Sequence, residues 1–376
     1  MLNSLKVNIL RNLSNIPGWR TRRRLVVFES DDWGSIRMPS VEVFEKLSHS
    51  GIDMTSDEGY RFNKYDSLET AEDLTSLFDI LSGTKDSTGR PAVFTPVSVV
   101  SNPDFEKIMH SGFSGYFYEP FVKTLEKYPG CDNSYALWKE GIAKRLFMPQ
   151  FHGREHLNVK AWMSALKGNH RNTLETFKYG MWGISTNNDP DIGIELQAAF
   201  DFIDPGDLTY QEEVIATGLA LFRELFGYRA TFFVPPNGPF SSKLESVCIR
   251  NGIKYLSTSK IQLEPVGHKK TVKKLHRLGQ KSNSGITYLT RNCFFEPSQS
   301  GQNWIERCLA ETANAFKWHK PAVISTHRVN YIGALHRVNR EKGLSELSLL
   351  LKEIMKNWPE TEFITSHELG EIITGD

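Results

Sequence analysis

The chain has 376 residues, of which 39% are hydrophobic and 24% are charged, and its formal net charge is +1 at pH 7. This composition is typical of a globular enzyme with a large core. The near-neutral charge argues against nucleic acid as a partner, and because no run of about 18 apolar residues occurs, we expect no transmembrane segment.

The N-terminal residues 1–10 carry apolar side chains at helical spacing, and four arginines follow within residues 20–24. We expect residues 1–24 to form an amphipathic helix and a basic segment packed on the outside of the fold; peripheral membrane contact is the alternative. No signal-peptide pattern is present, and the four cysteines lack CxxC spacing. Both features favour a cytoplasmic protein with reduced thiols.

Short apolar runs of strand composition recur along the rest of the chain. They span residues 25–28, 92–100, 146–151, 230–234, 253–256, 286–289, 322–325 and 363–365. Segments with helical periodicity, such as 211–226 and 345–358, lie between most of them. We expect the basic segment 268–277 to be a solvated helix or loop, and a contact with an acidic glycan is the alternative. This alternation predicts one α/β domain over residues 25–376, a distorted (β/α)7–8 barrel with an insertion around 101–145.

Polar side chains follow many of these predicted strands. Asp31 and Asp32 follow the first, His152 and His156 the third, the sequence Pro235-Pro-Asn-Gly238 the fourth, Arg291 the sixth and His327 the seventh. In a parallel barrel the carboxyl ends of the strands share one face, which carries the active site. We therefore expect these residues to meet there.

Adjacent carboxylates are unfavourable unless a cation lies beside them. One carboxylate with two imidazoles is a common ligand set for a catalytic divalent metal, and the second carboxylate would then be free to transfer a proton. The spacing of His152 and His156 places both on one side of a helical turn, if a helix begins at Gly153. Zn²⁺ suits this ligand set best, and iron, cobalt or nickel are the alternatives. His327 is a candidate catalytic residue on the same face.

Taken together, these motifs resemble those of polysaccharide deacetylases of the NodB-homology type (carbohydrate esterase family 4), within the glycoside hydrolase/deacetylase barrel superfamily. The matching segments are Ser30-Asp31-Asp32-Trp33-Gly34, His152-Gly-Arg-Glu-His156, Phe233-Val-Pro-Pro-Asn-Gly238 and Ser325-Thr-His327, in the family's order. The resemblance implies that Asp31 is the general base, that Asp32, His152 and His156 bind the metal, and that His327 is the general acid.

The chain also departs from the family pattern. Gly153 replaces a serine or threonine, Val234 stands where an arginine would orient the base, and Asn237 replaces a tyrosine. Either Arg291 or Arg328 is a candidate source of the missing guanidinium.

We expect a metal-dependent carbohydrate deacetylase, a hydrolase acting on carbon–nitrogen bonds other than peptide bonds, that removes N-acetyl or less readily O-acetyl groups. Its partner would be an acetylated glycan or a sugar precursor. Residues expected to contact the substrate are Trp33 at the rim of the site, Pro236, Asn237 and Arg291. The alternatives are a metal-assisted glycoside hydrolase of the same superfamily and a non-catalytic glycan-binding barrel, the latter motivated by the missing arginine and tyrosine.

Overall fold

A computed structural model describes residues 11–55, 59–186 and 189–375. Its centre is a ten-stranded sheet, and two short two-stranded sheets lie outside it. The strands are β1 (Arg24–Trp33), β2 (Phe94–Val99), β3 (Ser101–Pro103), β4 (Tyr118–Pro120), β5 (Gln150–Gly153), β6 (Phe232–Phe233), β7 (Tyr255–Thr258), β8 (Ile261–Gly267), β9 (Lys270–Leu275), β10 (Gln280–Lys281), β11 (Thr287–Thr290), β12 (Cys293–Phe294), β13 (Ala322–His327) and β14 (Thr361–Phe363).

The helices fill most of the intervals between strands. They are α2 (Val41–His49), α3 (Gly59–Tyr65), α4 (Ala71–Gly83), α5 (Phe105–His110), α6 (Phe121–Leu125), α7 (Ser134–Ala143), α8 (Val159–Lys167), α9 (Arg171–Phe177), α10 (Asp207–Phe226), α11 (Glu245–Arg250), α12 (Trp304–Lys317), α13 (Arg337–Asn357) and α14 (Ser366–Thr374), with 3-10 turns at Ser242–Leu244 and Arg328–Asn330. Residues 11–15 are also helical, whereas residues 1–10 of the predicted N-terminal helix lie outside the described part.

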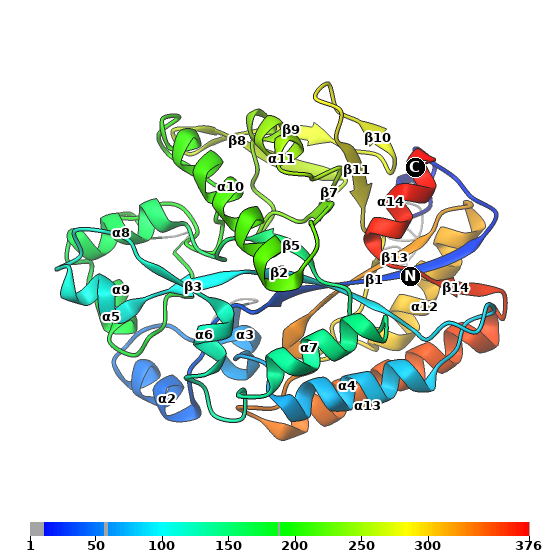
Figure 1. Ribbon diagram of the computed structural model, residues 1–376, viewed down its shortest axis with the longest axis horizontal. Coiled ribbons are helices and arrows are strands. Elements are labelled where there is room, and N and C mark those ends of the chain that lie inside the picture. Colours follow the sequence, from blue (N-terminus) through cyan, green and yellow to red (C-terminus); the bar gives the residue numbers. More distant parts are fainter. Residues whose placement is uncertain (1–10, 56–58, 187–188, 376) are drawn as a thin grey trace.

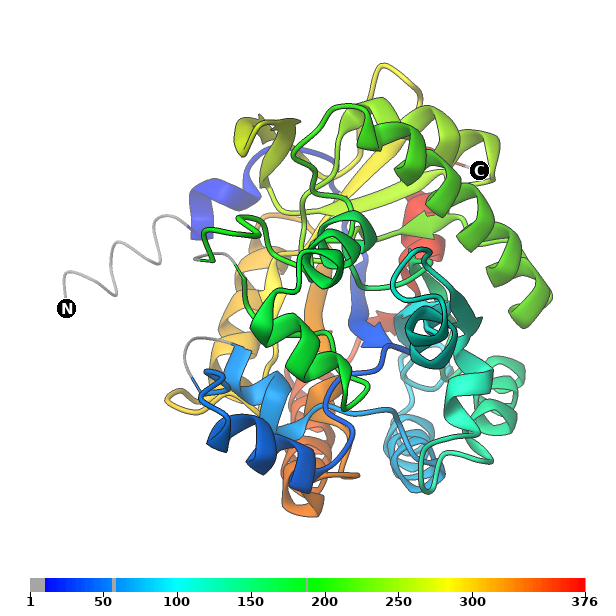
Figure 2. The same ribbon diagram turned by 90° about the vertical axis from the view of Figure 1, so that its left-hand side faces the viewer.

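The main sheet is parallel and curled, which confirms the predicted α/β barrel class. Its strands run in the order β12-β13-β1-β2-β5-β6-β7-β11, and β14 pairs with the start of β1. All of these neighbours are parallel, and only β10 is antiparallel, beside β11. No pairing within the described ranges joins β12 to β10 or β11, so this barrel is open. Helices surround the strands in both views (Figures 1 and 2).

All eight predicted strands are present, but β12 and the hairpin of β8 and β9 were not predicted. The basic segment 268–277, predicted as a helix or loop, contains the whole of β9, which pairs antiparallel with β8. His268 and Lys269 turn the chain between these strands with φ of 54° and 58°. Two successive positive φ values are the geometry of a tight hairpin turn, and the absence of glycine at both positions hid this turn in the sequence.

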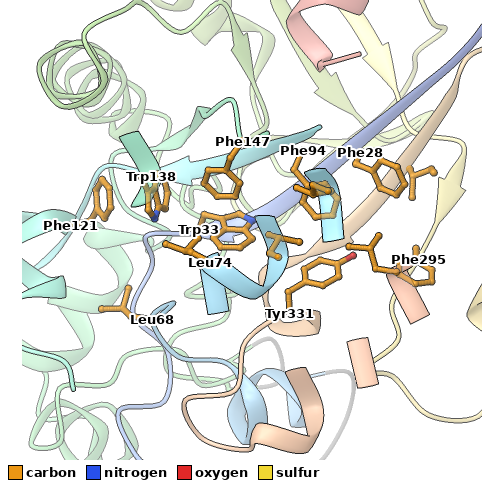
Figure 3. Packing of buried hydrophobic residues seen from close by; sticks show 14 of the residues in the cluster. Phe28, Trp33, Leu68, Leu74, Phe94, Phe121, Trp138, Phe147, Phe295 and Tyr331 are labelled. Carbon is orange, nitrogen blue, oxygen red and sulfur yellow. The ribbon is translucent and has the colours of Figure 1, made fainter. Parts of the chain in front are cut away.

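Aromatic side chains dominate the largest core cluster, beside β1 and β2 (Figure 3). Phe28 stacks on Phe94, with ring centroids 5.3 Å apart. Trp33 is 1% exposed, and its ring meets Phe147 edge-on at 4.8 Å and Trp138 at 6.2 Å. This packing fixes the carboxyl end of β1, where the candidate site begins, because large aromatic side chains bury much apolar area in specific geometries.

Residues 101–145 form β3, α5, β4, α6 and α7 between β2 and β5, at the position of the predicted insertion. The segment that precedes β1 is fastened to α12 and the loop that follows it: Arg11 pairs with Glu311 at 2.8 Å, and Lys320 Nζ donates to three carbonyls of residues 17–19. In the described ranges, no helix has the length and apolarity required to cross a membrane.

Candidate metal centre and catalytic site

Asp31 and Asp32 lie near the end of β1, where the strand is irregular. In a regular strand, two successive side chains point to opposite faces of the sheet. Here the register between β1 and β2 shifts between Ser30 and Trp33, and Asp32 has a φ of 75°, which is uncommon for a residue other than glycine. Both carboxylates consequently line the same cleft.

The two histidines come from the end of β5 and the loop after it, not from a helix. His152 and Gly153 are the last residues of β5, and α8 begins only at Val159. The helical placement predicted for the pair is therefore wrong. Gly153 has a φ of 135°, and an added Cβ would lie 3.1 Å from the carbonyl oxygen of Glu155. Glycine permits this sharp turn, which explains why no serine or threonine stands there, and the turn returns His156 to 5.0 Å from His152, ring to ring.

Asp32, His152 and His156 converge on one point. The Nε2 atoms of His152 and His156 lie 3.5 and 3.1 Å from the same oxygen of Asp32, Oδ1. The Nδ1 atom of His152 lies 2.7 Å from the carbonyl oxygen of Val234, which fixes the ring with Nε2 toward Asp32. Potential ligand atoms of the three residues lie within 4.8 Å of one another, and all three residues are buried.

Unsatisfied polar atoms support a metal at this point. Asp32 Oδ2, His152 Nε2 and His156 Nδ1 are buried and have no hydrogen-bond partner. Buried polar atoms without a partner are costly, and such groups in a native protein often mark an ion or a catalytic role. Burial also lowers the pKa of His156 to about 4, so its imidazole is neutral, as a metal ligand must be. The donor set therefore fits a divalent cation.

The charge balance around the two aspartates also supports a bound cation. Two sets of ion pairs lie side by side at Asp31 and Asp32. In one, Asp32, Asp66 and Glu69 pair with Arg37 and Arg328; in the other, Glu29, Asp31 and Glu296 pair with Arg291, Arg61 and His327. With all of these groups ionised and His327 protonated, one negative charge remains, in the set that contains Asp32. Because uncompensated charge in a buried network is strongly unfavourable, a cation bound beside Asp32 would offset it.

Arg291 holds Asp31 from the turn after β11. Its Nη1 and Nη2 atoms donate to Asp31 Oδ2 and Oδ1 at 2.5 and 2.6 Å, and its Nε donates to Glu29 Oε2 at 2.6 Å. Burial by itself would raise the pKa of Asp31, but the guanidinium lowers it below the usual range. Arg328, the other candidate for this role, instead pairs with Asp66 and Glu69. The ionised carboxylate of Asp31 is thus held by the bidentate guanidinium of Arg291, although position 234 carries a valine.

His327, at the end of β13, lies beside Asp31. Its Nε2 atom is 3.8 Å from Asp31 Oδ2, and its Nδ1 atom is 2.6 Å from Glu296 Oε1. Burial would lower the pKa of His327, but the Glu296 carboxylate outweighs burial and raises it. Burial would likewise raise the pKa of Glu296, yet His327 and Arg61 lower it to about 2. The pair therefore favours a protonated imidazole, the form that a general acid requires.

The site opens into a cleft of about 550 Å³, and not every predicted substrate contact lines it. Asn237 and Arg291 line the cleft, together with both aspartates and His327. Trp33 does not: it is in the aromatic core, where its Nε1 donates to Ser30 Oγ at 2.9 Å, so its placement at the rim was wrong. Pro236 is also buried and is not among the lining residues; its ring lies beside Gly153.

Three residues at the site were missed in the sequence. Glu29 lies two positions before Asp31 on β1, so both side chains are expected on the same face of the sheet. The two-residue period of a strand could therefore have identified Glu29 from the sequence. Glu296 follows β12, which was not recognised as a strand, and its partnership with His327 had no sequence signal. Arg37 lies in a loop with its Nη2 3.5 Å from Asp32 Oδ2, between the rings of Phe62 and Trp182.

The sequence matches no protein-family model and no curated protein. Several solved structures align with most of the chain. A protein assigned as a polysaccharide deacetylase from Mycobacterium smegmatis is 11% identical, with a TM-score of 0.47 over 96% of this chain and 93% of its own. A protein assigned as a glycoside hydrolase/deacetylase from Parabacteroides distasonis is 9% identical, with a TM-score of 0.48 over 94% and 72%. An allantoinase is 12% identical, with a TM-score of 0.43 over 95% and 93%. Polysaccharide deacetylases, the family that the sequence motifs resemble, are thus among the solved structures similar to this chain.

Proposed function

We propose that the protein is a metal-dependent hydrolase that removes an acetyl group from the amide nitrogen, or less readily a hydroxyl oxygen, of a saccharide. One observation carries the proposal: two adjacent carboxylates have separate partners. Asp32 faces two imidazoles, whereas Asp31 is held by Arg291 and lies beside His327. Such a division separates metal binding from proton transfer, which is what hydrolysis of an acetamide needs.

Asp32, His152 and His156 would hold the metal, with Zn²⁺ as the best fit to one carboxylate and two imidazoles. A divalent ion bound there supplies Lewis acidity, which polarises an acyl oxygen and lowers the pKa of water. The carbonyl of Val234 fixes the His152 ring for this role, and Arg37 offsets the charge of the second Asp32 oxygen.

Asp31 and His327 would carry the two proton transfers. Asp31, kept ionised by Arg291, accepts a proton from the attacking water as the new bond to the acyl carbon forms. His327 donates from Nε2 to the leaving nitrogen as the carbon–nitrogen bond breaks, because its Nδ1 is engaged by Glu296. The backbone N–H of Asn237, which also lines the cleft, is proposed to stabilise the oxyanion.

The products of the reaction distinguish this function from its alternatives. We expect the zinc-loaded protein to release acetate from N-acetylated chito-oligosaccharides without generating new reducing ends. New reducing ends without acetate would instead indicate a glycoside hydrolase. Saturable binding with neither product, after metal has been added, would indicate a non-catalytic glycan-binding barrel. That last alternative was motivated by the missing arginine, and the position of Arg291 on Asp31 weakens its basis.

The proposed partner is an acetylated glycan or a sugar precursor. The cleft is large enough for more than one sugar unit, since its volume is about 550 Å³, and it is lined by hydroxyl, amide and charged side chains. A cytoplasmic location, proposed from the sequence, would favour a precursor over a finished polysaccharide. Localisation of a tagged full-length chain by fractionation tests this point.

A further inference from the structure

Several residues that line the catalytic cleft have no part in the proposed mechanism. We define a distal subsite by five of them: Ser14 of the N-terminal helix, Thr258 at the end of β7, Ser259 and Lys260 after that strand, and Phe294 at the end of β12. These side chains are two hydroxyls from one strand end, a third from the N-terminal segment, an ammonium group and an aromatic ring. Such a combination is suited to a polar ring that carries a charge.

Lys260 differs from the other cations of the cleft. Each arginine that lines it pairs with a carboxylate: Arg11 with Glu311, Arg37 with Asp32, Arg61 with Glu296, and Arg291 with Asp31. Lys260 Nζ contacts only neutral oxygens, at 3.1 and 3.2 Å on Ser14 and 3.2 Å on Asn15, and it forms no ion pair with a described carboxylate. Burial lowers the pKa of Lys260, whereas the charge of Glu311, which is itself paired with Arg11 and Arg307, acts in the opposite direction. An anion beside it would stabilise the ammonium form.

Thr258 provides an independent sign of a ligand. Its Oγ1 atom is buried without a hydrogen-bond partner, and the residue is only 9% exposed although it lines the cleft. A buried hydroxyl without a partner costs free energy unless a ligand or a water satisfies it. Phe294, which lines the same cleft, is 40% exposed, and the Arg307 guanidinium lies over its ring at 5.7 Å, so the rest of its exposed surface is what a sugar could contact.

We propose that the distal subsite binds an anionic oxygen group, a carboxylate or a phosphate ester, on the part of the substrate next to the acetylated sugar. Lys260 supplies the charge, Thr258 donates a hydrogen bond and Phe294 packs against the ring. This inference rests on the proposed function for the location of the acetyl group, but the binding of the anion does not require turnover. It narrows the substrate to an acidic saccharide or a phosphorylated sugar precursor.

Three acetylated probes separate the possibilities, namely N,N′-diacetylchitobiose as the neutral probe, a disaccharide of glucuronic acid and N-acetylglucosamine as the carboxylate probe, and N-acetylglucosamine 1-phosphate. We expect KM for acetate release, and Kd by calorimetry, to be about tenfold lower for at least one anionic probe than for the neutral one, since a charge-assisted contact contributes about this factor. The anionic probe with the lower KM and Kd shows whether the group bound is a carboxylate or a phosphate ester. Equal constants for all three probes would overturn the inference.

Substitutions of Lys260 and Thr258 test whether the preference for an anionic probe arises at the distal subsite. Lys260→Gln should remove the preference for the anionic probe by raising its KM about tenfold while kcat and the neutral probe are unchanged. Lys260→Arg, which keeps the charge, should retain the preference. Thr258→Val keeps the shape but removes the hydroxyl, so it tests the subsite without disturbing the N-terminal segment. Lys273→Gln, on the exposed strand β9, is the matched control and should change nothing.

Failure of this inference can be told apart from failure of the proposed function. If acetate is released equally from all probes and Lys260→Gln behaves as the wild type, the deacetylase function stands and the anionic subsite is refuted. If no probe releases acetate but an anionic probe binds and Lys260→Gln weakens that binding, the subsite stands and the hydrolase function is refuted.

Discussion

Arg291 donates hydrogen bonds to both carboxylate oxygens of Asp31, at 2.5 and 2.6 Å, although the two residues are separated by 260 positions in the chain. The same guanidinium also binds Glu29 through Nε. The orienting arginine thus comes from the turn after β11 and not from position 234 after β6, where the family pattern would place it. The geometry of the proposed general base depends on this one side chain.

Replacing the guanidinium of Arg291 by another cation should impair the chemical step. In Arg291→Lys, a single ammonium cannot reproduce two parallel hydrogen bonds, so Asp31 loses its fixed orientation. We expect kcat to fall about 10- to 100-fold, within the range of a general acid–base contribution, with metal content and KM unchanged. Steady-state kinetics check this, with Arg250→Lys on the exposed end of α11 as the control. Wild-type kcat in Arg291→Lys would refute the assigned role.

Removing the charge should also destabilise the fold. Arg291→Gln leaves Asp31 and the fully buried Glu29 without their cation. Breaking a buried ion pair costs about 3–5 kcal/mol in the free energy of unfolding. Urea denaturation measures the loss, and the double variant Arg291→Gln with Glu29→Gln should recover part of it. A loss no larger than that of Arg250→Gln would contradict this account.

The pH dependence should report His327. Its pKa is raised by Glu296, so the protonated acid is present below that raised value and is lost as the pH rises through it. The alkaline limb of kcat/KM should therefore lie above the usual histidine range. In Glu296→Gln the carboxylate is gone and burial remains, so the limb should move to lower pH. An unmoved limb in this variant would show that a group other than His327 controls it.

Metal binding should stabilise the protein measurably. A ligand that binds only the folded state adds about 2.7 kcal/mol at a free concentration 100 times its Kd. We expect Zn²⁺ to raise Tm and a chelator to lower it, whereas His156→Ala should have a Tm that neither addition changes much. His110→Ala, an exposed histidine at the end of α5, should respond as the wild type does. An equal response of His156→Ala would exclude it as a ligand.

Trp33 should behave as a core residue and not as a substrate contact. Trp33→Phe loses the indole hydrogen bond to Ser30 and part of the packing against Phe147 and Trp138. We expect the free energy of unfolding to fall by about 1–3 kcal/mol, with KM unchanged. A raised KM in a variant of wild-type stability would restore Trp33 to the substrate site.

Much of the fold was predictable because each main strand has its own local signal. Buried parallel strands such as β1 and β13 are continuous apolar runs, and the polar residues that follow them mark the active face. The hairpin of β8 and β9 lacks that signal, since β9 is exposed along its whole length and rich in lysine. Strand β12 has two residues and was missed, whereas β6, which is equally short, was predicted because it lies within the apolar run 230–234.

The site itself was only partly predictable. Spacing suggested that His152 and His156 act together, but the helix assumed for them is a glycine turn that only the backbone reveals. Long-range partners such as Glu296 for His327 depend on which strands become neighbours, and a single sequence does not state that. Trp33 was misplaced because a tryptophan beside a motif is equally suited to a rim and to a core.

The most direct test of the central claim compares zinc-loaded wild type with Asp31→Asn, measuring both bound metal and acetate release. The two aspartates are proposed to divide metal binding and proton transfer between them. Asp31→Asn should therefore retain one equivalent of metal and lose kcat by about 10²-fold or more. Full activity in Asp31→Asn, or loss of the metal with the activity, would contradict this division.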